Sequence, residues 1–458
     1  MITVTLDDIA KAIGGVLIGE RARPVTGIGT DSRTIGAGQV FFAISGEHTD
    51  GHRYVRMCAE RGAAGAVVSR PVDAPEGFPL IYVADTVWAL GCFARWYRSL
   101  FDIPVVGITG SAGKTTTKEM TAAALSARYT VLKSPQNLNT EIGLPLAIAQ
   151  IEAHHEVAVL EMAMRGRGQI DWLAYIARPR IGVITNIGWA HLGLLGSRDN
   201  IALAKSELLY RLPEGGVAVL NADDDYFDFC RRQAHCRVVS FGYRRSAMVR
   251  ATRVHVEEDG RVRCVLRYGR EQASLHVPVP GLHHLSNALA ALAVAVVLDV
   301  PLAEAVEKLQ QMPALDKRMQ VYRTPKRITV LDDTYNANPA SVNAALQTLE
   351  RMANGCRRVV VLGDMLELGD EAPRWHREIG REVARIGAQV LIAVGELAEE
   401  VTRGARESKN PPLCLTFADS HAAAQSVHHW LQQGDMVLVK GSRGLQMELV
   451  VKAIFEDC

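Results

Sequence analysis

One short segment of the chain, residues 105–120 (VVGITGSAGKTTTKEM), carries the residue types that bind phosphate. Its apolar run leads into a turn with Gly110 and Gly113, and Lys114 and Thr115 then open a helical pattern. Glycine permits backbone conformations and close approaches that a side chain would block. Loop amides and the dipole of a helix N-terminus favour an anion, and the Lys114 ammonium adds a full positive charge. The residues that we expect at the phosphates of a nucleotide are Gly110, Ser111, Ala112, Gly113, Lys114, Thr115 and Thr116.

The spacing of this segment differs from that of the common phosphate-binding loop. The pattern G-x-x-x-x-G-K-[ST] would place glycine at position 108, where this chain has Ile108, and the shorter form T-G-x-x-G-K-T-T is present instead. A glycine turn followed by an incidental lysine is the alternative interpretation. The strand pattern before the turn and the helix pattern after it favour the phosphate site.

Two polar residues at later strand ends have the chemistry to accompany a triphosphate, which needs a metal ion. Glu161 closes the run EVAVLEM, and His191 follows VITNIG. Ligands of open α/β sheets gather at the carboxyl edge, where we expect both residues. A carboxylate and the Thr115 hydroxyl are hard oxygen ligands of the kind that Mg²⁺ prefers. Taken alone, Glu161 also fits a solvated strand-end carboxylate, and His191 a packed or surface histidine.

These residues need a framework of strands and helices to position them, and the sequence predicts one. The apolar runs PVVGIT, EVAVLEM, RIGVITNIG and GGVAVLNADD are each followed by polar or glycine-containing turns and are separated by helical segments. This layout indicates a parallel sheet flanked by helices. Residues 249–280 alternate instead, with turn candidates at EDG and YGRE. They predict an antiparallel ribbon, followed by the helix SNALAALAVAVVLDV.

Similar alternation lies on both sides of this region. Before it, residues 64–69 and 79–85 predict short buried strands, and residues 86–100 predict a helix. After it, the runs RITVLDDT, RRVVVLGDM, QVLIAVGE and DMVLVKGS predict strands covered on both faces. A chain of 458 residues is too long for one ordinary core. We therefore expect an α/β protein of two or three domains, with boundaries near residues 101–104 and 313–320.

The overall composition excludes some classes of protein. The 51 basic and 50 acidic residues give a net charge of +1, which argues against a nucleic-acid partner but allows small anionic ligands. The eight cysteines are scattered without a C-x-x-C pair and indicate reduced thiols. The N-terminus lacks a signal-peptide pattern, and the longest apolar run, residues 288–298, is too short to span a bilayer. We expect a cytoplasmic monomer.

Motifs along nearly the whole chain resemble those of one family, the ATP-dependent Mur ligases of bacterial cell-wall synthesis. In order, they are TDSR, VFFAISGEHTDGH, TGSAGKTTTKEM, QNLNTEIGLP, VLEMAMRGRGQI, TNIGWAHLGLLGS, ALAKSEL, PGLHHLSNALAALA, LDDTYNANPAS, VVVLGDMLELG and VLVKGSRGLQME. Such an ordered set is very specific for the superfamily. The motifs DDTYNANP and GDMLELG favour the member that adds a dipeptide.

The resemblance implies a ligase that uses ATP and Mg²⁺ and has three domains. They are a smaller N-terminal α/β domain (1–101), a central parallel-sheet P-loop ATPase domain (102–314) and a C-terminal Rossmann-like α/β domain (315–458). The N-terminal domain would bind a UDP-sugar, the central domain ATP, and the C-terminal domain would close over the site. In the implied reaction, ATP phosphorylates the terminal carboxylate of UDP-MurNAc-tripeptide to an acyl phosphate. The amine of D-Ala-D-Ala then attacks this group, and phosphate leaves a new peptide bond.

The resemblance also implies roles for residues near the phosphates. Lys114 would offset negative charge, because phosphoryl transfer is mostly positioning and charge neutralisation. Thr115 and Glu161 would hold the Mg²⁺ that bridges the β- and γ-phosphates, and His191 would belong to a second Mg²⁺ nearer the carboxylate. Lys205, in ALAKSEL, matches a lysine that many members carry as a carbamate, which supplies oxygen ligands where an ammonium would repel the metal. Without the resemblance, Lys205 has the pattern of a solvated helix lysine.

Further positions match contacts to the nucleotide. Asn137 and Asn139 match a loop beside the reacting phosphates, although turn formation also explains them. Asn287 matches an adenine contact, and His284 stands where the family commonly has another asparagine, a departure that affects one adenine contact. Arg318 and Asp333 match residues that reach ATP from the third domain; a guanidinium suits phosphate and a carboxylate suits ribose hydroxyls.

The remaining matches concern the other substrates. Near the incoming dipeptide they are Asn336 and Asn338, and at the uridine nucleotide they are Ser32, Arg33, Gly46 and His52. Phe41 and Phe42 match the uridine end as well, and predict a strand with at least one side chain in the core. The basic stretch KGSRG, residues 440–444, faces either anionic substrate or solvent.

Three alternatives compete with dipeptide addition. A sister ligase would add the third residue, L-lysine or diaminopimelate, but the Asp-Asn-Pro-Arg motif usual in diaminopimelate-adding members is missing from this chain. A folylpolyglutamate synthase shares the ATPase plan, although the first 100 residues match a UDP-sugar domain better. A P-loop protein that hydrolyses ATP only as a switch is the alternative from another functional class.

Overall fold

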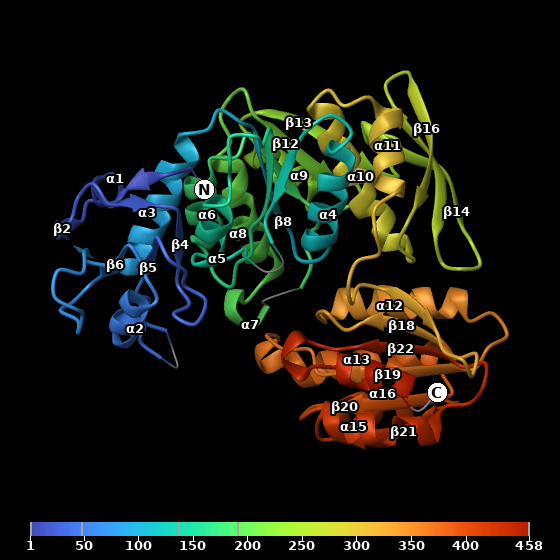
Figure 1. Ribbon diagram of the computed structural model, residues 1–458. Helices are drawn as coiled ribbons and strands as arrows, with labels where there is room; N and C mark the ends of the chain where they lie inside the picture. The colour runs from blue at the N-terminus through green and yellow to red at the C-terminus, as the bar shows by residue number, and fades with distance from the viewer. Residues whose placement is uncertain (1, 47–48, 136–137, 190–191, 457–458) are drawn as a thin grey trace.

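The computed structural model describes residues 2–46, 49–135, 138–189 and 192–456 (Figure 1). Three α/β units follow one another along the chain, each built around its own main sheet. In Figure 1 the first is blue, the second runs from cyan to yellow, and the third is orange to red. The chain therefore has the α/β class predicted from its alternating apolar and helical patterns.

The N-terminal unit contains a five-stranded sheet, in which β2 is antiparallel to its neighbour and the other strands are parallel. In spatial order the strands are β2 (Val16–Ile18), β7 (Leu80–Tyr82), β6 (Gly65–Val68), β5 (Gln39–Phe42) and β4 (Gly27–Gly29). A separate antiparallel pair and the helical segments complete the unit: β1 (Val4–Thr5), β3 (Pro24–Val25), α1 (Leu6–Ile13), η1 (Gly51–Tyr54), α2 (Val55–Glu60) and α3 (Thr86–Ser99). Phe41 and Phe42 are both buried, on opposite faces of β5.

The central unit contains a nine-stranded sheet with two parts. From β9 to β14 neighbouring strands are parallel, and β15 and β16 extend the sheet in antiparallel fashion, as residues 249–280 predicted. In spatial order the strands are β16 (Glu271–Val277), β15 (Val262–Tyr268), β14 (Val249–Val256), β13 (Arg237–Gly242), β12 (Val217–Asn221), β11 (Ile181–Ile184), β8 (Val105–Thr109), β10 (Val157–Glu161) and β9 (Val131–Lys133). Its helices are α4 (Lys114–Leu125), α5 (Gly143–Ile148), α6 (Gln169–Ala177), α7 (Leu192–Leu195), α8 (Arg198–Tyr210), α9 (Phe227–Gln233), α10 (Leu282–Val297) and α11 (Leu302–Gln310).

The strand order places β8 at the point where the direction of winding reverses. The chain leaves β8 through α4 to the edge strand β9, returns to β10 beside β8, and then crosses to β11 on the other side of β8. At such a switch point the loops after neighbouring strands diverge and leave a crevice at the carboxyl edge of the sheet. The ends of β8, β10 and β11 therefore meet at one place, which is where the phosphate loop begins.

The C-terminal unit contains a six-stranded sheet that is parallel except for the edge strand β17. In spatial order the strands are β17 (Gln320–Arg323), β18 (Thr329–Asp333), β22 (Met436–Lys440), β19 (Arg358–Gly363), β20 (Val390–Val394) and β21 (Leu413–Phe417). The helical segments are α12 (Pro339–Met352), η2 (Gly369–Glu371), α13 (Ala372–Arg385), α14 (Ala398–Arg406), α15 (Ser420–Ser426), η3 (Val427–Trp430), η4 (Arg443–Leu445) and α16 (Glu448–Glu456). The sequence analysis did not predict β17 and β21, because these edge strands are partly exposed and lack a continuous apolar run.

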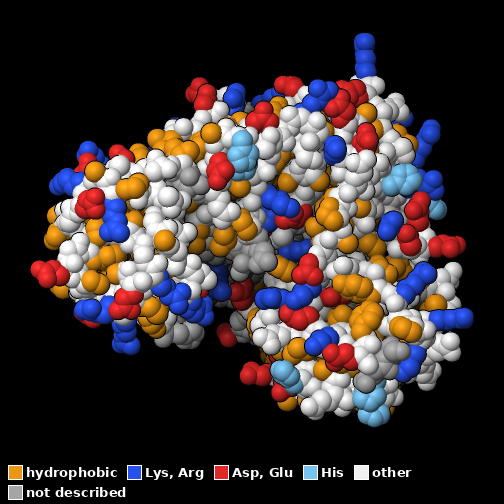
Figure 2. Space-filling view, in the orientation of Figure 1, with side chains coloured by type: hydrophobic (Ala, Val, Ile, Leu, Met, Phe, Trp, Pro, Cys, Tyr) orange, Lys and Arg blue, Asp and Glu red, His pale blue; other side chains and the backbone are white. Residues whose placement is uncertain are grey.

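The central and C-terminal units touch beside the phosphate loop. A β-carbon on Gly193, in α7, would lie 2.7 Å from Cα of Gly369, at the start of η2. The rings of Trp189 and Trp375 lie 5.7 Å apart. Figure 2 shows the surface hollowed between the N-terminal and C-terminal units, with basic side chains on its walls.

Two global features agree with the composition. None of the helices in the described ranges is long and apolar enough to cross a membrane. The seven cysteines that the structure describes are free thiols.

Candidate nucleotide and metal site

The phosphate loop joins β8 to α4 and presents unpaired amides. Gly113 caps α4 with a left-handed φ of 80°, and no side chain caps the first turn. The first amides of a helix have no carbonyl partner within it, so they remain available to a ligand. The Lys114 ammonium donates to the carbonyl of Gly110 at 3.0 Å, which folds it back over the loop. The arrangement is a concave anion site with one full positive charge.

Neighbouring loops hold the first half of this turn in place. The amide of Ser111 donates to the carbonyl of Asn186 at 3.0 Å, and the amide of Ala112 to the Asn186 Oδ1 at 3.0 Å. The Thr185 hydroxyl donates to the carbonyl of Ala112 at 2.6 Å. The backbone amides of Ser111 and Ala112 are thus engaged within the protein. Among the described residues, the amides that remain for phosphate are those of Gly113, Lys114, Thr115 and Thr116.

The two glycines are required because other side chains occupy the space beside them. A β-carbon on Gly110 would collide with the hydroxyl of Thr185, which follows β11. A β-carbon on Gly113 would collide with the side-chain oxygen of Asn287, which lies on α10. Both positions also have positive φ, where residues with a β-carbon are strained.

A buried carboxylate ends β10 next to this loop. Glu161 is 2% exposed, and its Oε1 accepts a hydrogen bond of 2.9 Å from Nδ2 of Asn139. Its Oε2 is also buried and has no partner among the described residues. Burying a carboxylate oxygen without a partner costs free energy unless a cation binds to it. Burial lowers the pKa of Lys114, and the charge of Glu161 opposes this shift.

A magnesium ion fits this donor set. Within the described residues, no cluster of three or more His, Cys, Asp or Glu side chains forms a complete metal cage. Mg²⁺ commonly takes only one or two protein oxygens and completes its shell with water and substrate phosphates. Glu161 and Thr115, the latter in the first turn of α4, supply oxygens of this kind. Two other predicted residues, His191 and Asn137, lie outside the described residues.

Lys205 lies inside the protein, which differs from an ordinary helix lysine. It is 1% exposed on α8, and no carboxylate of the described residues forms an ion pair with it. Burial, together with the charge of Lys114, lowers the pKa of Lys205 well below its usual value. Burial therefore favours the neutral amine, which is the form that reacts with carbon dioxide.

The N-terminal turn of α10 reaches the phosphate loop through Asn287. The Thr117 hydroxyl donates to Asn287 Oδ1 at 3.4 Å, and Asn287 Nδ2 lies 3.3 Å from Nδ1 of His284. Burial lowers the pKa of His284 well below its usual value, so the ring is neutral. With Nδ1 accepting from Asn287, the ring proton is on Nε2, which is buried without a partner among the described residues. His284 therefore holds the orientation of Asn287.

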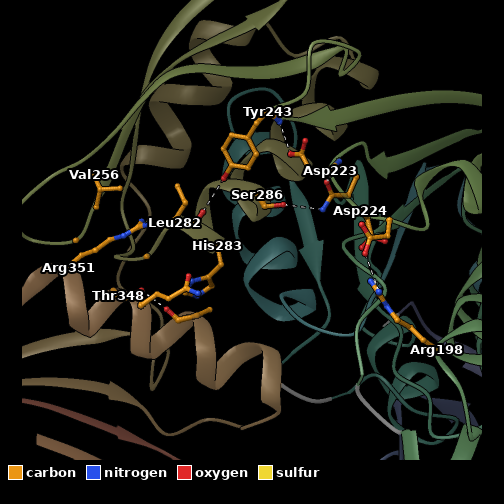
Figure 3. Close-up of a pocket in the computed structure, with 16 residues that line it drawn as sticks. Arg198, Asp223, Asp224, Tyr243, Val256, Leu282, His283, Ser286, Thr348 and Arg351 are labelled. Carbon is orange, nitrogen blue, oxygen red and sulfur yellow. Dashed lines mark hydrogen bonds and ion pairs between the residues drawn. The ribbon is translucent and has the colours of Figure 1, made fainter. Parts of the chain in front are cut away.

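A cavity of about 430 Å³ adjoins this turn, within the usual size range of small-molecule sites (Figure 3). It is lined by Arg198, Asn221, Asp223, Asp224, Asp225, Tyr243, Val256, Gly260, Gly281, Leu282, His283, Ser286, Ala344, Gln347, Thr348 and Arg351. The Nδ2 of Asn221 donates to the carbonyl of Thr185 at 3.0 Å, and Thr185 in turn contacts the phosphate loop. Thr185 therefore links one wall of the cavity to the phosphate loop.

The sequence analysis missed most of this lining. Asn221 ends the run GGVAVLN and β12, and Asp223 follows two residues later; polar residues at a strand end were a signal that could have found them. The carboxylate of Asp223 accepts hydrogen bonds from the amides of Tyr243, at 2.7 Å, and Arg244, at 3.0 Å, so it is part of the wall. Arg351 comes from α12 of the C-terminal unit, and only the contact between the two units brings it here.

The C-terminal unit presents Arg318 and Asp333 toward the same place. The guanidinium of Arg318 lies 3.9 Å from the ring centre of Tyr335. Burial is the main cause that lowers the pKa of Lys114 and of His284, and the charge of Arg318 from the C-terminal unit adds to it. Asp333 ends β18, and its Oδ1 accepts a hydrogen bond of 3.1 Å from the amide of Met319.

The two asparagines predicted near the dipeptide have structural partners. Asn338 caps α12, since its Oδ1 accepts the amide of Ser341 at 2.9 Å. Asn336 Oδ1 accepts the amide of Ala337 at 2.9 Å, and the amide nitrogen of the side chain is left for other contacts. Both asparagines shape the loop between β18 and α12.

The four residues predicted at the uridine end follow β4 and β5, at one edge of the N-terminal sheet. Arg33 is exposed and donates to Asp31 at 2.7 Å, which lowers the pKa of Asp31 to about 2. Ser32 is buried and Gly46 is exposed. His52 is buried; its Nδ1 bonds the Asp50 carboxylate at 2.7 Å, and its Nε2 accepts from the amide of Ser69 at 3.0 Å. With both ring nitrogens used, His52 supports the loop.

Comparison with known proteins gives consistent matches over all three units. The models for the Mur ligase family catalytic domain, the Mur ligase middle domain and the Mur ligase glutamate ligase domain match residues 24–140, 108–295 and 317–443. The UDP-N-acetylmuramoyl-tripeptide–D-alanyl-D-alanine ligase of Bacillus subtilis is 33% identical over 460 residues, covering 100% of this chain and 99% of that protein.

Two solved structures extend the comparison to the fold. A crystal structure of MurF from Acinetobacter baumannii superimposes with a TM-score of 0.91 at 32% identity, covering 99% of both chains. The MurF ligase from Thermotoga maritima in complex with ADP gives a TM-score of 0.83 at 28% identity, covering 94% of this chain and 97% of that one.

Proposed function

Because the chain belongs to the Mur ligase family, we propose that it joins D-alanyl-D-alanine to UDP-N-acetylmuramoyl-tripeptide with consumption of ATP, in the synthesis of peptidoglycan precursors. The observation that carries this proposal is the full-length match to relatives named for this reaction. The geometry supports its ATP-dependent half, since a buried carboxylate ends the strand beside the anion site and Thr185 links that site to a cavity.

The reaction proceeds in two balanced steps. A carboxylate oxygen of the tripeptide attacks the γ-phosphorus of ATP, which gives an acyl phosphate and ADP. The amine of the dipeptide then attacks the acyl carbon, the amide forms, and phosphate leaves while the amine loses a proton. An acyl phosphate hydrolyses in water, so a site between domains that shields it is chemically required.

The residues of the central unit act mainly by positioning and charge. The free amides of the α4 N-terminus and the Lys114 ammonium would hold the phosphates and offset the repulsion between triphosphate and carboxylate. Arg318, from the C-terminal unit, would contact the phosphates from the other side. The cavity beside α10 would take the nucleoside, with Asn287 near the base and Asp333 near the ribose.

Magnesium would be held by Glu161 and Thr115, with His191 at a second ion. When bound, it neutralises phosphate charge and orients the transferred group. We propose that Lys205 carries a carbamate: its neutral nitrogen attacks carbon dioxide, and a proton leaves to water. The resulting anion would offer oxygens to the metal. It would also be paired with Lys114, whose charge adds to the effect of burial in lowering the pKa of the Lys205 amine.

The other substrates would occupy the units on either side. The carboxyl ends of β4 and β5, with Ser32, Arg33 and Gly46, would receive the uridine nucleotide, and His52 would act by supporting that loop. The dipeptide would lie against the loop that contains Asn336 and Asn338. Because the reaction consumes ATP and a nucleotide-linked precursor, we propose a cytoplasmic location. We also propose that the protein is a monomer, because one chain offers a surface for each substrate.

A phosphate-release assay tests this proposal. Purified protein is expected to release phosphate only when UDP-MurNAc-tripeptide and D-Ala-D-Ala are both present, and Lys114→Ala is expected to be folded and inactive. Release with L-lysine or diaminopimelate in place of the dipeptide would identify a sister ligase. Release with ATP alone at the same rate would identify a switch ATPase instead.

A further inference from the structure

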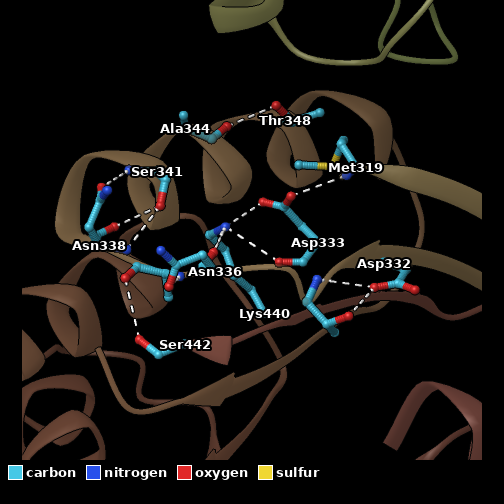
Figure 4. A network of polar contacts seen from close by, with 12 residues as sticks. Met319, Asp332, Asp333, Asn336, Asn338, Ser341, Ala344, Thr348, Lys440 and Ser442 are labelled. Atoms are coloured by element: carbon cyan, nitrogen blue, oxygen red, sulfur yellow. Dashed lines mark hydrogen bonds and ion pairs between the residues drawn. The ribbon is translucent and has the colours of Figure 1, made fainter. Parts of the chain in front are cut away.

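Lys440 ends β22 with its ammonium inside the protein. Only 3% of the side chain is exposed, and the Nζ donates to three oxygens: Asp333 Oδ2 at 2.6 Å, the carbonyl of Asn336 at 2.8 Å and the carbonyl of Asp333 at 3.4 Å (Figure 4). A buried ammonium is tolerated only when its donors are satisfied in this way. The stretch 440–444 is expected to face either anionic substrate or solvent, and within it the Lys440 ammonium is turned toward protein oxygens.

The three oxygens belong to one loop with two proposed ligand contacts. Asp333 is the proposed ribose contact, and Asn336 and Asn338 lie in the segment proposed for the dipeptide. Strand register sets Lys440 directly beside Asp333, because β18 and β22 are parallel neighbours paired at these two residues. The ammonium therefore connects the end of β18 to the turn that leads into α12.

Lys440 also fixes the direction of the Asp333 carboxylate. One oxygen accepts the amide of Met319 at 3.1 Å and the other accepts Lys440, so the carboxylate cannot rotate freely. Each oxygen keeps a lone pair for a ligand hydroxyl. Figure 4 shows Ala344 and Thr348 on α12 beside this pair, and both residues line the cavity. The pair therefore lies next to the helix that forms one wall of the proposed nucleoside site.

We propose that Lys440 is a positioning residue that sets two substrate sites at once. It orients Asp333 toward the ribose of ATP, and through the Asn336 carbonyl it shapes the loop that receives the dipeptide. This role rests on the proposed function, because it assumes that ATP and a dipeptide meet at this loop. Lys440 acts through Asp333 and Asn336, so it touches neither ligand.

The test separates the two sites by substitution. Lys440→Met removes the ammonium and keeps an unbranched side chain, and Asp333→Asn removes only the carboxylate. Lys452→Met is the matched control, since Lys452 is exposed on α16 and pairs with Glu456 one turn away. The measurements are KM for each of the three substrates, kcat, and binding of ADP by calorimetry.

Lys440→Met is expected to raise KM for ATP and for the dipeptide at least tenfold each, and to leave KM for UDP-MurNAc-tripeptide within twofold. Asp333→Asn is expected to reproduce only the ATP effect. The double variant should bind ADP as tightly as whichever single variant binds it more weakly, because the two substitutions remove the same contact. Equal changes in all three KM values, or a loss of thermal stability with unchanged KM values, would overturn the positioning role.

Two further outcomes are decisive. Lys440→Gln keeps a hydrogen-bond donor and replaces the methionine variant if that one does not fold. If neither folds, Lys440 is a folding residue only and the proposal fails. The proposed function is judged on the wild-type protein in the same assay: absence of ligation there rejects the function, whereas the calorimetric arm still reports whether Lys440 orients the nucleotide site.

Discussion

The side-chain oxygen of Asn287 occupies the place that a β-carbon on Gly113 would need, although 174 positions separate the two residues in the chain (287 − 113). This contact fastens the N-terminal turn of α10 to the phosphate loop. It makes Gly113 a residue that is required for two reasons, a left-handed backbone and the approach of Asn287. The two reasons predict different effects and are separable by experiment.

Gly113→Ala is expected to lower the affinity for ADP at least tenfold, because the methyl group displaces Asn287 and distorts the loop. Gly14→Ala is the matched control: Gly14 has a similar positive φ of 67° and open space around it. Both variants should lose about 1–2 kcal/mol of stability from backbone strain. Calorimetric binding distinguishes them, and equal ADP affinities in the two variants would contradict the role of the Asn287 contact.

Glu161→Gln is expected to raise the Mg²⁺ concentration for half-maximal ligation at least tenfold, or about 1.4 kcal/mol. The amide keeps the shape of the side chain and its contact with Asn139 but removes the charge that an ion would require. A magnesium titration of the reaction rate measures this shift. Glu214→Gln, at an exposed position, is the control, and an identical magnesium dependence in both variants would argue against a metal at Glu161.

Lys205 is expected to carry a carbamate that depends on carbon dioxide. Protein prepared in buffer free of carbon dioxide should lose most of its activity and regain it with bicarbonate. Carbon-13 bicarbonate should give a carbamate resonance in the wild type and in the Lys409→Met control, which changes an exposed lysine. The resonance should be missing in Lys205→Met. If the wild-type spectrum shows no such resonance in the active protein, Lys205 acts as an amine.

His283 is expected to make stability fall as the pH drops from about 6.5 to about 4. Burial is the main cause that lowers its pKa to about 4, so in this range the unfolded chain takes up a proton that the folded chain does not. The contribution of His283 to the free energy of unfolding is fully present above the ordinary histidine pKa. It is lost as the pH falls toward the pKa of His283 in the folded protein. A difference of one pKa unit corresponds to about 1.4 kcal/mol. Because the side chain keeps some contact with solvent, the free energy of unfolding should fall by about 1–3 kcal/mol.

Urea unfolding at several pH values measures this effect. His283→Gln should flatten the acid side of the stability profile, whereas His421→Gln, at an exposed position, should leave the profile unchanged. Parallel profiles for wild type and His283→Gln would show that other groups control acid unfolding.

Gly193→Ala is expected to push the C-terminal unit away from the central unit, because Cα of Gly369 lies 2.7 Å from the position of the new methyl group. Activation and transfer need both units, so kcat should fall at least tenfold while binding of the UDP-linked substrate stays unchanged. Small-angle scattering should show a more open particle with all ligands present. Gly215→Ala, which adds a methyl group in open space, is the control. Wild-type kcat in Gly193→Ala would mean that the glycine contact does not belong to the active arrangement.

Several features of the site depended only on local sequence. The phosphate loop follows from an apolar strand, two glycines and Lys114, because a strand, a tight turn and a helix N-terminus form from neighbouring residues alone. The position of Glu161 at a strand end followed from the same kind of local pattern. The ribbon at residues 249–280 was also predictable, since alternation with turn residues defines a hairpin without reference to the rest of the chain.

Other features were decided by the tertiary structure. Strand order is not contained in any one segment, so the placement of β8 between β10 and β11, which brings Glu161 to Lys114, appears only in the folded sheet. Whether a lysine is buried depends on partners that are distant in sequence. Lys440 is held by a loop more than 100 positions earlier, at Asp333 (440 − 333), and Lys205 is covered by packing around α8.

The general reason is the range of the forces involved. Backbone conformation and helix capping act over a few residues, so the sequence alone determined the elements and the phosphate loop. Burial and pairing of charge act through space, so only the packed domains decided that His52 supports a loop, that Asn287 reaches Gly113, and that Arg351 lines a cavity of the central unit.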